Sequence, residues 1–221
     1  MPFSVYLRLD MKKSLKTILV ILALLLTASI LFVGCTKEKS SPAPDYSALD
    51  LGEYVTLGEY KDLQISLGGV VSEDMTNDVV LWGAIVSKAE IIKYPEDALL
   101  YYKEQSIRLY TVYAEEGNIS YEELMSSLGK TDKDIEAEAK EYVKSDLVSL
   151  AIIEAEGLRL TEDEKARLFD KYAYKFSTTY GYAVDYVYEN LKKEIYEAMQ
   201  HDKMMEFLLL NNEITVITEE E

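Results

Sequence analysis

The sequence predicts a mainly α-helical protein with one or two short β-strands, and three patterns indicate this. From Tyr94 onward, apolar residues recur every three or four positions, which is the repeat of an amphipathic helix. Helix-start residues and terminal glycines divide the chain into six helices. Only two short stretches alternate between apolar and polar residues, as strands do.

The strands are expected at two places far apart in the sequence. Asp62–Leu67 alternates, with Leu63, Ile65 and Leu67 on one side. Glu213–Thr218 alternates less regularly, and we predict that it pairs with the first strand and ties the two ends together. Asp146–Thr161 resembles Lys203–Thr218, because both end a helix with an apolar cluster and continue through a turn into an extended tail. This faint duplication makes the first tail a candidate strand as well.

The first two helices are predicted from Ser72 to about Ser87 and from Tyr94 to Gly117. Ser72 precedes two acidic residues, which favour a helix N-terminus, and the apolar face of that helix is expected at Val79, Val80, Gly83 and Val86. Pro95 suits the first helical position of the second helix. Its apolar face is expected at Leu99, Tyr102, Ser106, Leu109 and Tyr113.

Three of the other four helices begin at recognisable caps. Ser120 with Glu123 and Thr161 with Glu164 have the spacing of capping boxes, and Thr131 with Asp134 is a similar start. Glycines end two of these helices, at Gly129 and Gly157. The last helix is predicted from about Ala183 to Asn211, with an apolar face at Val187, Leu191, Ile195, Ala198, Met205 and Leu208.

Residues 1–34 have the parts of a secretory signal, with basic residues, an apolar core and a small residue before the cleavage point. Met11 is a suitable start for this signal. The Gly34-Cys35 ending resembles the lipobox of bacterial lipoproteins, which implies that Cys35 is diacylated and becomes the new N-terminus. We expect residues 35–54 to be a lipid-anchored flexible tether, because the chain after Cys35 is polar and contains proline and serine. The alternative is a membrane-spanning helix, since the uncharged run of residues 17–34 can just cross a bilayer.

Composition excludes several classes of function. The chain has 23 basic and 40 acidic residues, and without residues 1–34 it keeps 19 basic and 39 acidic residues. Such a charge repels nucleic acid, so no nucleic-acid partner is expected. His201 and Cys35 are the only residues of their types, which leaves no zinc site and no Cys–His catalysis. The carboxylates form no calcium loop and the glycines no phosphate loop, so no metal, cofactor or catalytic residue is expected.

Several segments resemble trigger factor, the bacterial chaperone that shelters nascent chains. LGEYKDLQI, which begins at Leu57, is similar to the family's LGDYKGLEV, and AEIIKYPED of Ala89–Asp97 resembles the segment that opens the family's substrate-cradling helices. Ser127–Glu164 resembles the family's helix pair ending in LV..AIAE.E.I.VT.EE, and MMEFLLLNNEITV resembles its closing helix. The resemblance implies an extended helical-arm chaperone body over residues 89–221, preceded by a short strand and linking helix over residues 55–88.

Two departures from the family shape the functional expectation. The ribosome-docking domain with its GFRxGxxP loop is missing, and only Gly68–Ser87 stands where the family inserts a prolyl isomerase domain. With the lipobox in front, the resemblance implies an ATP-independent chaperone or foldase on the extracytoplasmic face of the bacterial cell membrane. Its partners would be unfolded or newly exported polypeptides.

Tyrosine and methionine are the expected client-binding residues. The chain has 18 tyrosines and seven methionines, and these side chains suit a promiscuous surface because tyrosine is amphipathic and methionine adapts its shape. The tyrosines crowd together at positions 101–113 and 172–188, where Tyr182, Tyr186 and Tyr188 belong to the second group. The candidate client-binding residues are Tyr101, Tyr102, Tyr110, Tyr113, Tyr172, Tyr174, Tyr180, Met199 and Met204. Ordinary packing of half-exposed rings remains the alternative for each of them.

Two other functions stay open. The first is a prolyl isomerase inherited from the family, although twenty residues are too few to enclose its peptide-binding barrel. The second is a non-catalytic lipoprotein scaffold that uses the same helices for one dedicated partner. The sequence therefore favours a binding protein over an enzyme.

Overall fold

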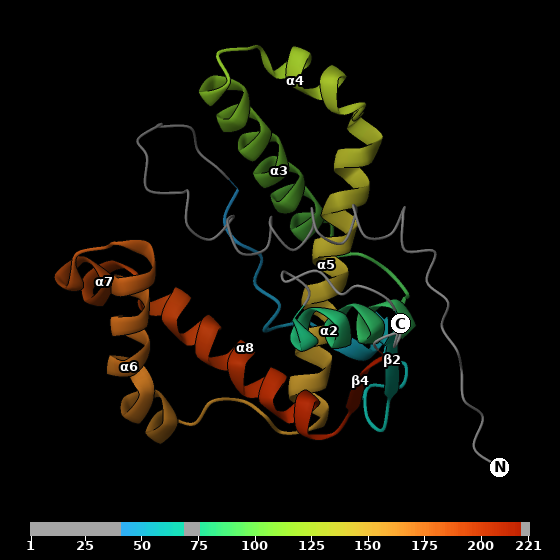
Figure 1. Ribbon diagram of the computed structural model, residues 1–221, viewed down its shortest axis with the longest axis vertical. Helices are drawn as coiled ribbons and strands as arrows, with labels where there is room; N and C mark the ends of the chain where they lie inside the picture. Colours follow the sequence, from blue (N-terminus) through green and yellow to red (C-terminus); the bar gives the residue numbers. More distant parts are fainter. Residues whose placement is uncertain (1–40, 69–75, 218–221) are drawn as a thin grey trace. The chain divides into compact units, whose positions relative to one another are not determined.

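The computed structural model describes residues 41–68 and 76–217, and it confirms the mainly α-helical class (Figure 1). Over these residues it contains seven α-helices, one short 3-10 helix and two sheets of two strands each. The described residues form two compact units. The first unit comprises residues 58–88 and 152–217, and the second comprises residues 41–57 and 89–151. Ser72, Cys35 and the proposed signal lie outside the described residues.

The second unit is built around α3 (Glu96–Glu116), α4 (Tyr121–Leu128) and α5 (Asp132–Ala155). Figure 1 shows α3 and α5 side by side, with the short α4 joining them. Pro95 is the N-cap of α3 rather than its first helical residue. The Ser120–Glu123 capping box at the start of α4 is confirmed, and Gly129 ends that helix in the left-handed conformation that glycine adopts most easily.

Tyrosines contribute much of the packing between these three helices. One cluster joins Leu109 of α3 to Tyr142 of α5, with Tyr102 packed against them. A second cluster joins Tyr110, Met125 and Ile135, one residue from each helix. The tyrosine rings in this unit therefore serve first to pack α3, α4 and α5 against one another.

Part of the segment expected to be a tether is bound to this unit. The Ser41 amide donates to the Glu104 carboxylate at 3.0 Å, and the Tyr46 hydroxyl donates to Asp146 at 2.9 Å. The segment then forms the 3-10 helix η1 (Leu51–Glu53) and the two-residue strand β1 (Val55–Thr56), which pairs antiparallel with β3 (Glu90–Ile91). The part of the expected tether from Ser41 to Tyr54 is therefore held against this unit by hydrogen bonds and leads into the β1–β3 pair.

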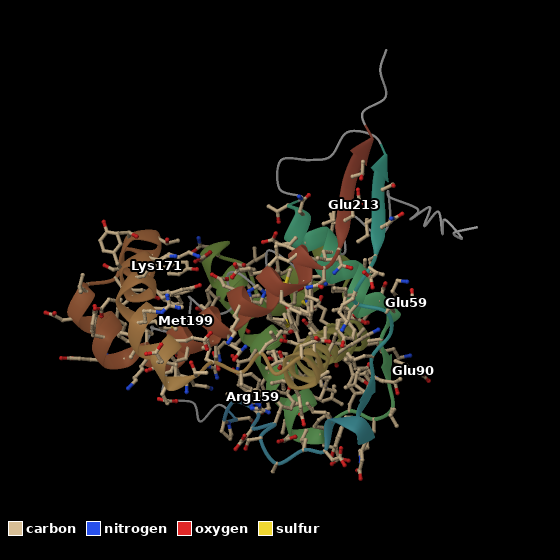
Figure 2. All side chains as sticks on the ribbon, turned by 90° about the horizontal axis from the view of Figure 1, so that it is seen from below. Glu59, Glu90, Arg159, Lys171, Met199 and Glu213 are labelled. Atoms are coloured by element: carbon tan, nitrogen blue, oxygen red, sulfur yellow. The ribbon has the colours of Figure 1, made fainter. Side chains whose placement is uncertain are left out.

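The helices of the first unit are α6 (Glu162–Tyr180), α7 (Val184–Asn190) and α8 (Lys192–Leu210). The single long helix predicted from Ala183 to Asn211 is wrong, because the backbone breaks at Leu191, where φ is −113° and ψ is 23°. Val187 before the break and Ile195 after it lie in the same core, against which Leu191 also packs. Figure 2 labels Met199, one of the two α8 members of this core, beside the α6 and α7 ribbons.

The predicted pairing of the two distant strands is confirmed. β2 (Gln64–Gly68) pairs parallel with β4 (Glu213–Ile217), from Gln64 opposite Glu213 to Gly68 opposite Ile217, and Figure 2 shows the two arrows running the same way. The first tail of the faint duplication is not a strand. There the Gln200 side chain takes the place of a partner strand, accepting from the Leu160 amide and donating to the Leu158 carbonyl, both at 3.0 Å.

Helix α2 (Asn77–Lys88) was predicted with the wrong face inward. Its buried residues are Leu81 and Ile85, four positions apart, whereas Gly83 is exposed. The two bulkiest aliphatic side chains at helical spacing decide which face is buried, since they remove the most apolar area from water.

Candidate functional site

Seven aromatic rings lie close together on α6, on α7 and its preceding turn, and on α8; we call this set the aromatic surface. Its members are Phe169, Phe176, Tyr180, Tyr182, Tyr186, Tyr188 and Tyr196. Phe169 contacts Tyr188 with 5.4 Å between ring centroids and Tyr196 with 5.7 Å. A second series of ring contacts runs from Phe176 through Tyr180 and Tyr182 to Tyr186, with centroid distances of 5.4, 6.4 and 5.5 Å. None of the seven side chains is buried, so the rings pack on one another while part of each stays open to solvent.

The local sequence explains why these rings stay at the surface. The core cluster shared by α6, α7 and α8 is made of small or aliphatic side chains and one methionine: Ala173, Val187, Ile195 and Met199. Ala173 is fully buried, which lets the other helices approach α6 closely and leaves the larger rings around the rim of the contact. Gly181, with a φ of 70°, ends α6 between Tyr180 and Tyr182 and turns the chain into α7. Phe169 and Phe176 are seven positions apart on α6 and so share one face.

The tyrosine hydroxyls near this surface are neutral hydrogen-bond donors. Tyr188 donates to Asp170 at 2.9 Å, and this hydrogen bond raises the pKa of its phenol. Tyr172, next to the surface, donates to Asp202 at 2.8 Å, and burial followed by this hydrogen bond raises its pKa. Burial also raises the pKa of Tyr182. The surface is therefore apolar in its rings and polar at its edges, with no charged phenolate at neutral pH.

The nine predicted client-binding residues fall into three groups. Tyr110, Met199 and Met204 are buried, with 4%, 2% and 0% of their surface exposed, so they are core residues. Tyr174 and Tyr113 are the exposed ones, at 67% and 37%. The remaining four are half-buried: Tyr101, Tyr102, Tyr172 and Tyr180. Tyr180 is the only one of the nine that belongs to the aromatic surface.

Sequence reasoning missed Phe169, Phe176 and Tyr196 as members of this surface. Phe176 and Tyr180 are four positions apart on one helix, a spacing that brings side chains together. That signal was available in the sequence. Tyr196 lies on a different helix from Phe169, and only the break at Leu191 brings them into contact.

A second group of tyrosines lies in the other unit, on α3 and α5. Tyr102 stacks on Tyr142 with 5.3 Å between centroids and meets Tyr101 edge-on at 5.1 Å. The Tyr102 hydroxyl donates to Asp146 at 2.6 Å. Burial, followed by the Asp146 charge, raises the pKa of Tyr102, so this phenol also stays protonated.

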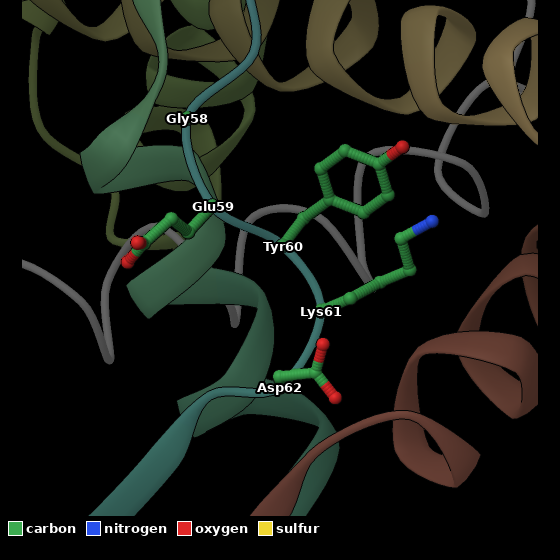
Figure 3. Close-up of a pocket in the computed structure, with 5 residues that line it drawn as sticks. All are labelled: Gly58, Glu59, Tyr60, Lys61 and Asp62. Carbon is green, nitrogen blue, oxygen red and sulfur yellow. The ribbon is translucent and has the colours of Figure 1, made fainter. Parts of the chain in front are cut away.

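A hollow of about 400 Å³ is lined by the loop Gly58–Asp62, shown in Figure 3. Tyr60 and Lys61 project to one side of this loop, away from Glu59. The Tyr60 hydroxyl and the Lys61 ammonium both donate to Glu156 at 2.6 Å. These groups fasten the loop to the end of α5, so we assign the hollow a structural role.

No metal site is found in the part of the chain that the structure describes. There, no three histidine, cysteine or acidic side chains are grouped to hold an ion. His201 is 60% exposed, with Nδ1 3.6 Å from Asp202 Oδ1. Among the same residues, no helix combines the length and the hydropathy needed to span a membrane.

No protein-family model matches the chain, and a search of curated proteins found no relative. The resemblance to trigger factor therefore depends on the short segments quoted above.

Proposed function

We propose that the protein is an ATP-independent chaperone or foldase that binds unfolded polypeptides non-covalently. The observation that carries this proposal is the aromatic surface, where seven rings contact one another in two groups, of three and of four, and none is buried. Half-exposed rings offer apolar area at low entropic cost, because a tyrosine has few rotatable bonds. Such a surface accepts many sequences and requires no bound nucleotide.

Local geometry in the family-like segment LGEYKDLQI supports this proposal. A Cβ atom on Gly58 would lie 2.4 Å from the Lys88 carbonyl oxygen, so only glycine fits there, and the family also has glycine at this position. Asp62 has a φ of 60°, a conformation that glycine adopts most easily, and it stands where the family has its second glycine. At both positions the backbone is therefore in an arrangement that suits glycine, which is the residue that the family has there.

We further propose that the protein is anchored through a diacylated Cys35 on the extracytoplasmic face of the cell membrane. Mass spectrometry of the mature N-terminus tests this directly, and a Cys35→Ser chain is the control. We expect diacylglycerol on Cys35 in the wild type and recovery of the variant in unprocessed or soluble form. An unmodified Cys35 in the wild type would contradict the anchor but not the binding function.

The binding function is tested by mixing the full chain with a chemically unfolded model protein and following light scattering. We expect an equimolar amount to reduce scattering several-fold. Tyr180→Ser combined with Tyr186→Ser should remove at least half of that protection, because both rings are half-exposed members of the aromatic surface.

Leu210→Ser is the matched control for that pair. Leu210 is 80% exposed and lies at the last residue of α8, far along the helix from Tyr196. The Leu210→Ser variant should protect the model protein from aggregation as well as the wild type does. Circular dichroism should show that all the variants are equally helical. A wild-type chain that leaves scattering unchanged would refute the chaperone proposal.

The number of partners separates this function from a dedicated scaffold. Chemical crosslinking in cells, followed by identification of the bound proteins, should give many exported proteins for a chaperone. One partner in fixed ratio would favour the scaffold.

A further inference from the structure

Residues 41–49 lie along α3 and α5 with a repeating pattern of burial. Ser41 and Pro44 are half-buried, while the two residues between them are exposed; Tyr46 and Leu49 repeat this pattern. Pro42 and Pro44 favour the polyproline II conformation up to Tyr46, whereas residues 47–48 form a turn in which the Leu49 amide donates to the Tyr46 carbonyl at 3.1 Å. Residues 41–46 therefore contact the helices in the manner of a bound extended peptide, and the turn follows them.

Tyr46 is the best-anchored residue of this segment. Its hydroxyl and that of Tyr102 both donate to the same Asp146 oxygen, at 2.9 and 2.6 Å. Burial, followed by the charge of Asp146, raises the pKa of Tyr46, and Asp97 and Tyr101 of α3 add to the effect. Tyr46 thus lies at a site formed by α3 and α5, where the Asp146 carboxylate accepts a hydrogen bond from its phenol.

Backbone contacts complete the site at its other end. The Ser41 amide donates to Glu104 of α3 at 3.0 Å, five residues before Tyr46. Many peptide sequences can supply one backbone amide and one tyrosine hydroxyl at this spacing. Neither contact depends on the identity of the residues between them.

We propose that the face of α3 and α5 around Asp146 is a binding site for an extended polypeptide segment with a tyrosine, and that residues 41–49 occupy it as an internal ligand. A client segment of the same chemistry displaces residues 41–49. The assignment of residues 41–49 as an internal ligand depends only on their contacts. The binding of a client segment, which we call the external ligand, rests on the proposed chaperone function.

Occupancy of this site would also set the reach of the protein from a lipid anchor. Five residues separate Cys35 from Ser41, and the six steps between their Cα atoms span at most about 20 Å. Release as far as Asp50 lengthens the connection to fourteen intervening residues, or at most about 50 Å. Client binding would then free the body to move further from the membrane.

Hydrogen exchange of the full chain tests the internal ligand without any client. Tyr46→Phe removes only the hydroxyl, and Asp146→Asn removes only the charge of its acceptor. Because a hydrogen bond to a charged group is lost, the amides of Ser41–Leu49 should exchange about 10- to 100-fold faster in both variants. Tyr188→Phe, which loses a phenol–aspartate bond on α7, should leave these rates unchanged. Unchanged rates in both test variants would overturn the proposal.

A labelled peptide SPAPDYSALD, copied from residues 41–50, tests the external ligand. It should bind the Tyr46→Phe chain about 10-fold more tightly than the wild type, because the competing internal segment is weakened. The same peptide with phenylalanine in place of its tyrosine should bind about 10-fold more weakly. An unfolded client should displace the labelled peptide.

The outcomes separate this inference from the proposed function. A client that is protected from aggregation but does not displace the peptide overturns the external ligand and leaves the chaperone function intact. Absence of peptide binding to Tyr46→Phe at millimolar concentration overturns the site itself.

Discussion

Gly58 passes so close to the end of α2 that a side chain has no space. A Cβ there would lie 2.4 Å from the Lys88 carbonyl oxygen and 2.7 Å from its Cβ. Gly58→Ala must therefore move the loop away from α2, and we expect a loss of about 1–3 kcal/mol in the free energy of unfolding, measured with urea.

Gly83→Ala is the matched control for this change. Gly83 lies within α2, and an added Cβ would meet no atom within 4 Å. The same substitution should stabilise the protein there by about 0.5–1 kcal/mol, because alanine favours the helix. Equal effects at the two glycines would contradict the close approach at Gly58.

Glu164 makes stability depend on pH. Hydrogen bonds from Lys203 and from Thr161 lower its pKa from an ordinary 4.5 to about 2. A carboxyl group with a lowered folded-state pKa stabilises the fold above its unfolded pKa, and this contribution is lost as the pH falls from 4.5 towards 2. Glu164→Gln should therefore be less stable than wild type at pH 7, with the difference shrinking by pH 3.

The control for Glu164 is Glu162→Gln. Glu162 is 89% exposed and pairs with Lys165 on the same turn, and exposed pairs contribute little. Urea midpoints at both pH values give the comparison. A wild-type advantage over Glu164→Gln that stays constant with pH would show that the carboxylate charge does not matter.

Burial of single tyrosines could not be predicted from sequence spacing. Tyr110 and Tyr113 are three positions apart on α3, yet they are 4% and 37% exposed. Their difference comes from α4 and α5, because Met125 of α4 and Ile135 of α5 pack on Tyr110. The sequence identifies which helix carries the rings but not which neighbouring helix covers them, so three of the nine candidate residues proved to be core.

At the scale of elements, Asn212 connects α8, β4 and the chain leading into β2. Its side-chain oxygen accepts from the Leu63 amide at 2.8 Å, and its amide donates to the carbonyls of Tyr60 at 3.0 Å and Leu208 at 2.7 Å. Asn212→Ala leaves these backbone groups without this partner, so we expect a loss of about 1–3 kcal/mol in unfolding free energy and faster hydrogen exchange in both strands.

The neighbouring Asn211 provides a control of identical chemistry. It is exposed, and its side chain donates only to the Phe207 carbonyl in the same helix, at 2.8 Å. Asn211→Ala should change strand exchange little. If the two variants behave alike, Asn212 does not hold the strands in register.

Elements with local signals were predicted well, and those set by distant contacts were not. The capping boxes at Ser120 and Thr161 are both present, since each depends on residues three positions apart. The pairing of β2 with β4 followed from two rare alternating stretches. The break at Leu191 depends on packing against α6, and the tail at Leu160 depends on Gln200 forty residues later, so neither has a local sign.

At the scale of the whole molecule, each unit presents its own aromatic set. The first carries the aromatic surface, and the second carries Tyr101, Tyr102 and Tyr142 beside Asp146. Both sets sit among carboxylates that accept from phenols, at Asp170 and Asp146. A client that binds here meets apolar area bordered by negative charge, which favours segments combining apolar and basic residues.

If the protein is the chaperone proposed above, its net charge of −17 predicts that client choice depends on salt. Charges attract basic clients and repel acidic ones over about 10 Å at 0.1 M ionic strength and over longer distances at lower salt. In the scattering assay at about 20 mM salt, we expect stronger protection of a basic client than of an acidic client of similar size, because charge steers association. At about 300 mM salt we expect the protection of the basic client and that of the acidic client to become similar. Protection through the aromatic surface should persist at this salt concentration, because salt does not screen apolar contacts. Equal protection of both clients at low salt would show that the acidic surface plays no part in selection.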